Sequence, residues 1–105
     1  MSIFAKRLKE ARKAAGLSQE RLGVLAGIDE MSASARMNQY ERGKHEPDFQ
    51  TVARIANALS LPTSFFYSEN EVEAKLIAAF HRLDPSTQLA LLHQAMQSAG
   101  VSESD

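Results

Sequence analysis

The chain of 105 residues has no cysteine, no tryptophan and only three prolines. Without cysteine it can form neither disulfide bonds nor thiolate metal sites, which fits the reducing cytoplasm. No stretch approaches the roughly 20 apolar residues of a membrane-spanning helix. Near the N-terminus, Lys6, Arg7, Lys9, Arg12 and Lys13 interrupt any apolar run, so no signal peptide is indicated. We therefore expect a cytoplasmic protein that does not enter a membrane.

The sequence also lacks the short patterns that carry familiar enzyme chemistry. It contains no glycine-rich phosphate-binding loop, no HExxH pattern and no nucleophile elbow. His81 and His93 fall in separate predicted helices, and no third ligand is evident beside them, so we expect no metal. We expect no cofactor either, and the chain is not predicted to be an enzyme.

The formal net charge of −1 hides an uneven distribution along the chain. Residues 1–44 contain nine Lys and Arg against five Asp and Glu, whereas residues 45–105 contain three against eight. A basic N-terminal part followed by an acidic C-terminal part is the distribution expected of a protein whose N-terminal part binds a polyanion and whose C-terminal part has a separate function. An unevenly charged solvated surface explains the same numbers.

Apolar residues recur at the spacing of a helix face, which predicts an all-α fold. Five helices are expected in residues 1–67, and two more in residues 71–99, ahead of a short tail at 100–105. The expected buried stripes of the first part are Phe4, Leu8, Ala11 and Ala15; Ala33, Met37 and Tyr40; and Phe49, Val52, Ile55, Ala56 and Leu59.

The stretch from Ser18 to Lys44 predicts two short helices joined by a turn. Gly23 lies inside the first helix, where glycine costs roughly 1 kcal/mol relative to alanine, so we expect another helix to approach closely there. Gly27 is placed as a left-handed residue after the last turn. The second helix ends near Arg42, and its outward residues are Ser34, Ala35, Arg36, Asn38, Gln39 and Arg42. Among them, arginine, asparagine and glutamine are the side-chain types that pair bidentately with base edges.

The order and spacing of these positions resemble the lambda-repressor-like, Cro-type helix-turn-helix family, also called the xenobiotic-response-element family. The resemblance covers about residues 3–67. One segment departs from the family pattern, since Asp29–Ser32 looks like an insertion in the turn, and it leaves Asp29, Ser32 and Ser34 as alternative N-caps of the second helix. The matching residues are Arg12, Gly16–Gln19, Leu22, Gly23, Ala26–Ile28, Met37–Lys44, Pro47, Val52–Leu59 and Leu61.

The resemblance implies roles for individual residues. Gln19 is expected to contact a DNA phosphate and to brace the recognition helix, and Arg12 to form an ion pair with Glu41. Arg42 and Lys44 would contact the DNA backbone, and the aromatic run Phe65–Tyr67 would close the core. The residues expected to face bases are Ser34, Ala35, Arg36, Asn38 and Gln39, with adenine the natural partner of Gln39.

Residues 71–99 are predicted to form a helical hairpin with a break at Asp84-Pro85. One hairpin cannot bury both of its apolar stripes, so it must pack on the head, on a second copy, or on both. The residues expected in a dimer interface are Leu76, Phe80, Leu89, Leu92 and Met96.

These features favour a bacterial or phage transcription regulator that binds double-stranded DNA as a homodimer, most simply a repressor of a near-palindromic operator. An alternative from another class is an antitoxin, or another interaction module whose C-terminal hairpin binds a partner protein. The controller of a restriction–modification system is a further alternative.

Overall fold

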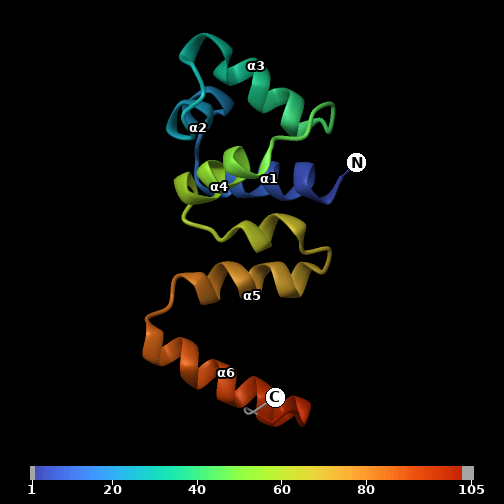
Figure 1. Ribbon diagram of the computed structural model, residues 1–105, viewed down its shortest axis with the longest axis vertical. Coiled ribbons are helices and arrows are strands. Elements are labelled where there is room, and N and C mark those ends of the chain that lie inside the picture. The colour runs from blue at the N-terminus through green and yellow to red at the C-terminus, as the bar shows by residue number, and fades with distance from the viewer. Residues whose placement is uncertain (1, 103–105) are drawn as a thin grey trace.

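The computed structural model describes residues 2–102, and every regular element in that range is helical (Figure 1). The predicted all-α fold is therefore confirmed. None of these helices is long and apolar enough to cross a membrane. The elements in order are α1 (Ile3–Ala14), α2 (Gln19–Leu25), α3 (Glu30–Glu41), α4 (Phe49–Ala58), the 3-10 helix η1 (Thr63–Tyr67), α5 (Glu71–His81) and α6 (Pro85–Ala99).

Most helices begin where the sequence places a capping side chain. Ser2, Ser18, Asp48 and Asp84 each accept a hydrogen bond from the backbone N–H three residues later, which satisfies one of the amides that a helix start leaves unpaired. Hydrogen bonds from the side chains of Ser86 and Thr87 also lower the pKa of Asp84 to about 2. Gly100 ends α6 with a φ of 72°, and the rest of the predicted tail, residues 103–105, lies outside the described residues.

The close approach predicted at Gly23 is present between α2 and α3. A Cβ atom added to Gly23 would lie 2.7 Å from the Cβ of Ala33, which is itself fully buried. Gly27 has the predicted left-handed conformation, with a φ of 86°. The helix-turn-helix unit is thus held at its centre by a contact that only glycine allows.

The beginning of α3 differs from the predicted inserted turn. Asp29 is the N-cap, because its carboxylate accepts a hydrogen bond from the N–H of Met31 at 3.1 Å, and Glu30–Ser32 form the first helical turn. Glu30 there suits the positive end of the helix. The additional residues therefore lengthen α3 instead of the turn, and neither Ser32 nor Ser34 is the cap.

The core lies between α1, α2, α3, α4 and η1. Three residues that were assigned to buried positions are exposed instead. Ala15 follows the end of α1, Phe49 stands at the first position of α4 with 72% of its surface exposed, and Tyr67 at the end of η1 is 55% exposed although its ring contacts that of Phe4. The largest fully buried apolar residues are Phe66, Leu8, Leu22, Met37, Ile55 and Val52.

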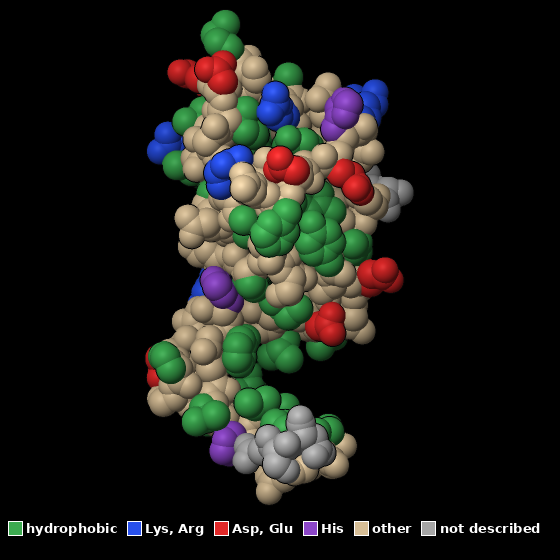
Figure 2. Space-filling model, in the orientation of Figure 1, with side chains coloured by type: hydrophobic (Ala, Val, Ile, Leu, Met, Phe, Trp, Pro, Cys, Tyr) green, Lys and Arg blue, Asp and Glu red, His purple; other side chains and the backbone are tan. Residues whose placement is uncertain are grey.

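The two C-terminal helices are present, but they diverge from their connection (Figure 1). Helix α5 packs on η1 and buries Ala74, whereas α6 buries no residue at all. The side-chain amide of Gln88 donates to the carbonyl of Phe80 at 2.8 Å and links the two helices near their connection. Between them lies the α5–α6 groove, walled by Leu76, Ile77 and Phe80 on one side and by Leu91, Leu92 and Ala95 on the other. On the face shown in Figure 2, hydrophobic side chains gather over this part of the molecule.

The α2–α3 contact predicts the result of Gly23→Ala. The added methyl group overpacks the interface, at about 1–3 kcal/mol, which outweighs the gain in helix propensity of up to about 1 kcal/mol. We expect a lower midpoint of unfolding in urea. In an Ala33→Gly background the same substitution should cost less, and an equal cost in both backgrounds would show that the contact with Ala33 is not the cause.

Candidate nucleic-acid interface

The outer face of α3 is polar and accessible. Ser34, Ala35, Arg36, Gln39 and Arg42 are all exposed, as predicted from their spacing, whereas the inner face residues Ala33, Met37 and Tyr40 are buried. Asn38 lies at the edge of this face and is half-buried. The helix therefore offers Arg and Gln side chains fully, and Asn in part, to a neighbouring molecule.

A basic hollow adjoins the C-terminal end of α3, where the end of α1 and the start of α2 also meet. Its lining has four cationic side chains against one carboxylate, so an anion is favoured there. Phosphate oxygens of a DNA backbone have the matching charge, and hydrogen bonds from lysine and arginine to such oxygens add affinity without sequence preference. The lining residues are Lys9, Arg12, Lys13, Ser18, Gln19, Asn38, Glu41 and Arg42.

Arg12 and Glu41 are paired at the floor of this hollow. Arg12 Nη2 donates to Glu41 Oε1 at 3.0 Å and its Nε to Oε2 at 2.5 Å, while Nη1 donates to the carbonyl of Leu17 at 2.8 Å. The side chains are only 12% and 3% exposed. Hydrogen bonds to the carboxylate raise the pKa of Arg12 above its usual value, so the guanidinium stays charged. The pair ties α1 to the end of α3.

Gln19 links α2 to the same site. Its Nε2 donates to Asn38 Oδ1 at 3.3 Å and to Glu41 Oε1 at 3.2 Å. An amide nitrogen has two hydrogens, and both are directed at α3. Gln19 therefore contacts α3 directly, and a phosphate contact through this amide would exchange one of these bonds.

A second hollow lies on the other side of α3. Arg36, Gln39 and Tyr40 line it together with His45 and Glu46 from the loop that follows the helix. Gly43, with a φ of 72°, turns the chain into this loop, and the neighbouring Lys44 is exposed. The structure thus places Arg36 and Gln39 on the flank of α3 opposite to the basic hollow, beside the loop that carries Lys44.

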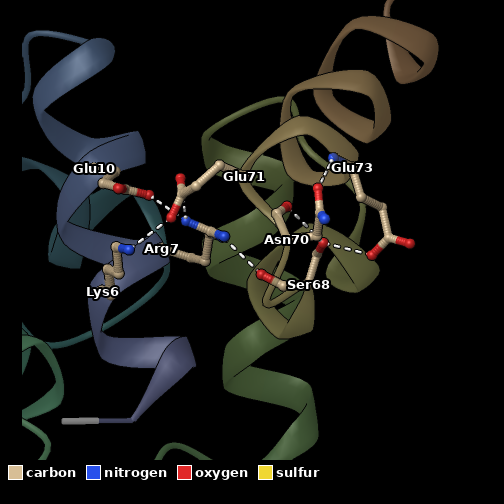
Figure 3. A network of polar contacts seen from close by, with 7 residues as sticks. All are labelled: Lys6, Arg7, Glu10, Ser68, Asn70, Glu71 and Glu73. Carbon is tan, nitrogen blue, oxygen red and sulfur yellow. Dashed lines mark hydrogen bonds and ion pairs between the residues drawn. The ribbon is translucent and has the colours of Figure 1, made fainter.

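The sequence reasoning did not find Arg7, the largest fully buried side chain. Arg7 Nε donates to the carbonyl of Ser68 at 2.9 Å, and Nη1 contacts Glu10 at 2.8 Å and Glu71 at 3.1 Å (Figure 3). Burial lowers the pKa of Arg7, but the hydrogen bonds to the two carboxylates outweigh it. The pKa is therefore raised. Its spacing of three from Phe4 and four from Ala11 places it on the buried stripe of α1, which is the signal that could have identified it.

The Arg7 cluster joins the head to the C-terminal helices. Lys6 Nζ lies 2.6 Å from Glu71 Oε1, so two cations of α1 hold the first residue of α5. The hydrogen bond from Lys6, and then that from Arg7, lower the pKa of Glu71. Ser68 donates in turn to Glu73, and Asn70 caps α5, so the joint between η1 and α5 is bonded on both sides (Figure 3).

The fold and this surface are those of the helix-turn-helix proteins, and the helix-turn-helix domain family matches residues 3–64. The chain belongs to this family of transcriptional regulators, which is not a family of enzymes.

Individual relatives agree with this assignment. The chain is 32% identical over 88 residues, 84% of its length and 76% of the relative's, to the SPbeta prophage-derived uncharacterized HTH-type transcriptional regulator YonR of Bacillus subtilis (strain 168). It is 31% identical over 72 residues to the HTH-type transcriptional regulator ImmR of the same organism, covering 69% of this chain and 54% of ImmR. The crystal structure of the transcriptional regulator BswR superposes with a TM-score of 0.83 at 42% identity, over 92% of this chain and 94% of BswR.

The Arg12–Glu41 pair predicts the result of Arg12→Ala. Removing the guanidinium leaves the buried carboxylate of Glu41 without its cation, which costs about 3–5 kcal/mol. We expect a correspondingly lower free energy of unfolding in urea. Lys9→Ala on the exposed face of the same helix is the matched control and should change it by less than about 0.5 kcal/mol. Equal effects of the two substitutions would contradict the role of the pair.

Proposed function

We propose that the protein binds double-stranded DNA sequence-specifically as a homodimer and represses transcription. The observation that carries this proposal is the outer face of α3, where Arg36, Gln39 and Arg42 are exposed on a helix that buried contacts hold in place. Arginine and glutamine are the side chains that pair bidentately with guanine and adenine in the major groove. The adjacent basic hollow supports the proposal because it supplies the backbone contacts that set the register.

The residues divide into two kinds of contact. Gln39 is the principal base-reading residue, with Ser34, Arg36 and Asn38 beside it and Ala35 against a thymine methyl group. Arg42, Lys44 and Gln19 contact phosphates or position the residues that do.

The first turn of α3 constrains how the helix can enter the groove. Asp29 and Glu30 place two carboxylates at its beginning, and both are exposed. Carboxylates are repelled by DNA phosphates, whereas Arg36 and Arg42 are attracted. The helix therefore approaches DNA with its middle and its C-terminal end, which is where Asn38 and Gln39 stand.

The apolar residues of α5 and α6 support a dimer. Leu76, Phe80, Leu89 and Leu92 are 38–55% exposed, and Met96 is half-buried. Exposed apolar surface of this extent, gathered in one region, marks a protein interface. A two-fold axis through this region would present two α3 helices to half-sites about one helical turn apart.

The same apolar groove also favours a second candidate function. An antitoxin, or another interaction module, would use the α5–α6 groove to hold a different protein. Stoichiometric co-purification of a second small protein would favour that candidate, and a protein that purifies alone as a dimer would favour the repressor.

The proposal can be tested by fluorescence anisotropy with DNA from the region upstream of the protein's own coding sequence. We expect binding tighter by about 10³ or more than binding to scrambled DNA of equal length, within the range for specific regulators. The affinity should fall steeply as salt rises, because bound cations are released from the phosphates. Equal affinity for the upstream DNA, for the scrambled DNA and for random genomic fragments would overturn sequence-specific binding.

The proposed roles predict different results for Gln39→Ala and Lys44→Ala. Gln39→Ala should lose about 1–3 kcal/mol of binding free energy on the preferred DNA and leave binding to random DNA unchanged. Lys44→Ala should weaken binding to both DNAs equally and reduce the slope against salt by about 1. An equal loss on both DNAs for Gln39→Ala would refute base reading by this residue.

A further inference from the structure

Helix α6 has a composition unlike that of an exposed helix. Its fifteen residues include no lysine, arginine, aspartate or glutamate, although 24% of the whole chain is charged. Every other α-helix in residues 2–102 carries charged side chains. Lysine, arginine, aspartate and glutamate are mostly exposed in folded proteins and are depleted at the centres of interfaces. Helix α6 has no fully buried residue, only the half-buried Gln88, Leu91 and Met96, and yet it carries no charge. This is the composition of a helix that is covered by another molecule.

The α5–α6 groove matches α6 in this respect. No lysine, arginine, aspartate or glutamate lines it, and its lining is mostly apolar, with Ser64, His81 and Gln88 as the polar members. The two charged residues between Leu76 and Ala99 both lie in the connection between the helices and have local partners. Arg82 donates to the carbonyl of Leu59, and Asp84 caps α6. The occupant that fits an uncharged groove is an uncharged helix.

The apolar surface of α6 is wider than the part that lines the groove. Leu91, Leu92 and Ala95 face the groove, whereas Leu89 lies on a neighbouring edge and is 55% exposed. Met96, seven residues after Leu89, shares this second edge, because it borders a separate hollow with His93 and Val101. One edge of α6 therefore walls a groove of its own chain, and on the other edge Leu89 is exposed while Met96 is only half-buried.

We infer that α6 of a second copy lies in the α5–α6 groove, with its Leu89–Met96 edge against Leu76 and Phe80, and that the two copies exchange α6 reciprocally. Because the exchange is reciprocal, the edge of each copy contacts the groove of the other, so the contact is isologous and closes at two copies. This inference rests on the homodimer proposed above and specifies how the two copies join.

The size of the interface is sufficient. A helix of fifteen residues is about 22 Å long and about 11 Å wide, so half of its surface is roughly 400 Å². Two exchanged helices and the two grooves that receive them would then bury about 1,500 Å² in total, within the range of stable interfaces. The groove is already open in the single chain, so neither copy must unfold to admit the helix.

The absence of native cysteine makes this arrangement testable by single substitutions. Leu76→Cys on α5 and Leu89→Cys on α6 are purified separately, mixed, and oxidised. A disulfide needs Cα atoms within about 7 Å, so it forms only where the two chains are in contact. We expect a cross-linked dimer from the mixture at a yield several-fold above that from either variant alone. Gln94→Cys, on the polar face of α6, is the matched control and should not cross-link to Leu76→Cys.

Sedimentation and DNA binding of the unmodified protein separate the possible failures. A dimer that shows no excess cross-linking in the Leu76→Cys and Leu89→Cys mixture overturns the exchange of α6 and leaves the proposed function intact. Equal cross-linking of the Gln94→Cys control would also overturn it. A protein that stays monomeric while it binds DNA specifically overturns both the exchange and the proposed homodimer, but not the proposed DNA binding.

Discussion

The ion pair between Arg12 and Glu41 determines where α3 stands, and the surface that it presents depends on it. Helix α3 buries only a few apolar side chains, so its position rests on two anchors. At one end, Gly23 admits the methyl group of Ala33, and at the other, Arg12 holds Glu41 while Gln19 bonds to the same carboxylate. A charge buried to this degree without its partner is strongly destabilising, so the pair specifies one orientation of the helix. These two anchors therefore hold the polar outer face of α3 in one orientation.

The sequence was most informative where a local rule determines the structure. Capping residues located the starts of α1, α2, α4 and α6, and the cost of glycine inside a helix indicated the contact at Gly23. It was least informative at helix ends, where one residue decides between burial and exposure, as at Ala15 and Phe49. The inserted turn was predicted wrongly because Asp29, Ser32 and Ser34 are all possible caps in the sequence, whereas in the structure Asp29 is the cap and α3 begins at Glu30.

The arrangement of the C-terminal helices could not be derived from their apolar spacing. The periodicities of α5 and α6 are compatible with a closed hairpin and with an open one, so the spacing of their apolar residues does not determine the angle between them. The buried stripe of α1 includes Arg7, but the sequence does not identify its partners Ser68 and Glu71. Contacts between residues more than sixty positions apart carry no signal in a single sequence.

The burial of Arg7 fixes the position of α5 relative to the head. A flexible tether between two modules would let each head settle independently, whereas α5 is fastened to α1 by an arginine that is 1% exposed. In a dimer joined through α5 and α6, the separation and the relative rotation of the two heads would be built into the protein. One inserted base pair turns a half-site by about 34° around the helix axis. Rigid arms cannot follow that rotation, so such a dimer would bind only targets with one spacing between half-sites.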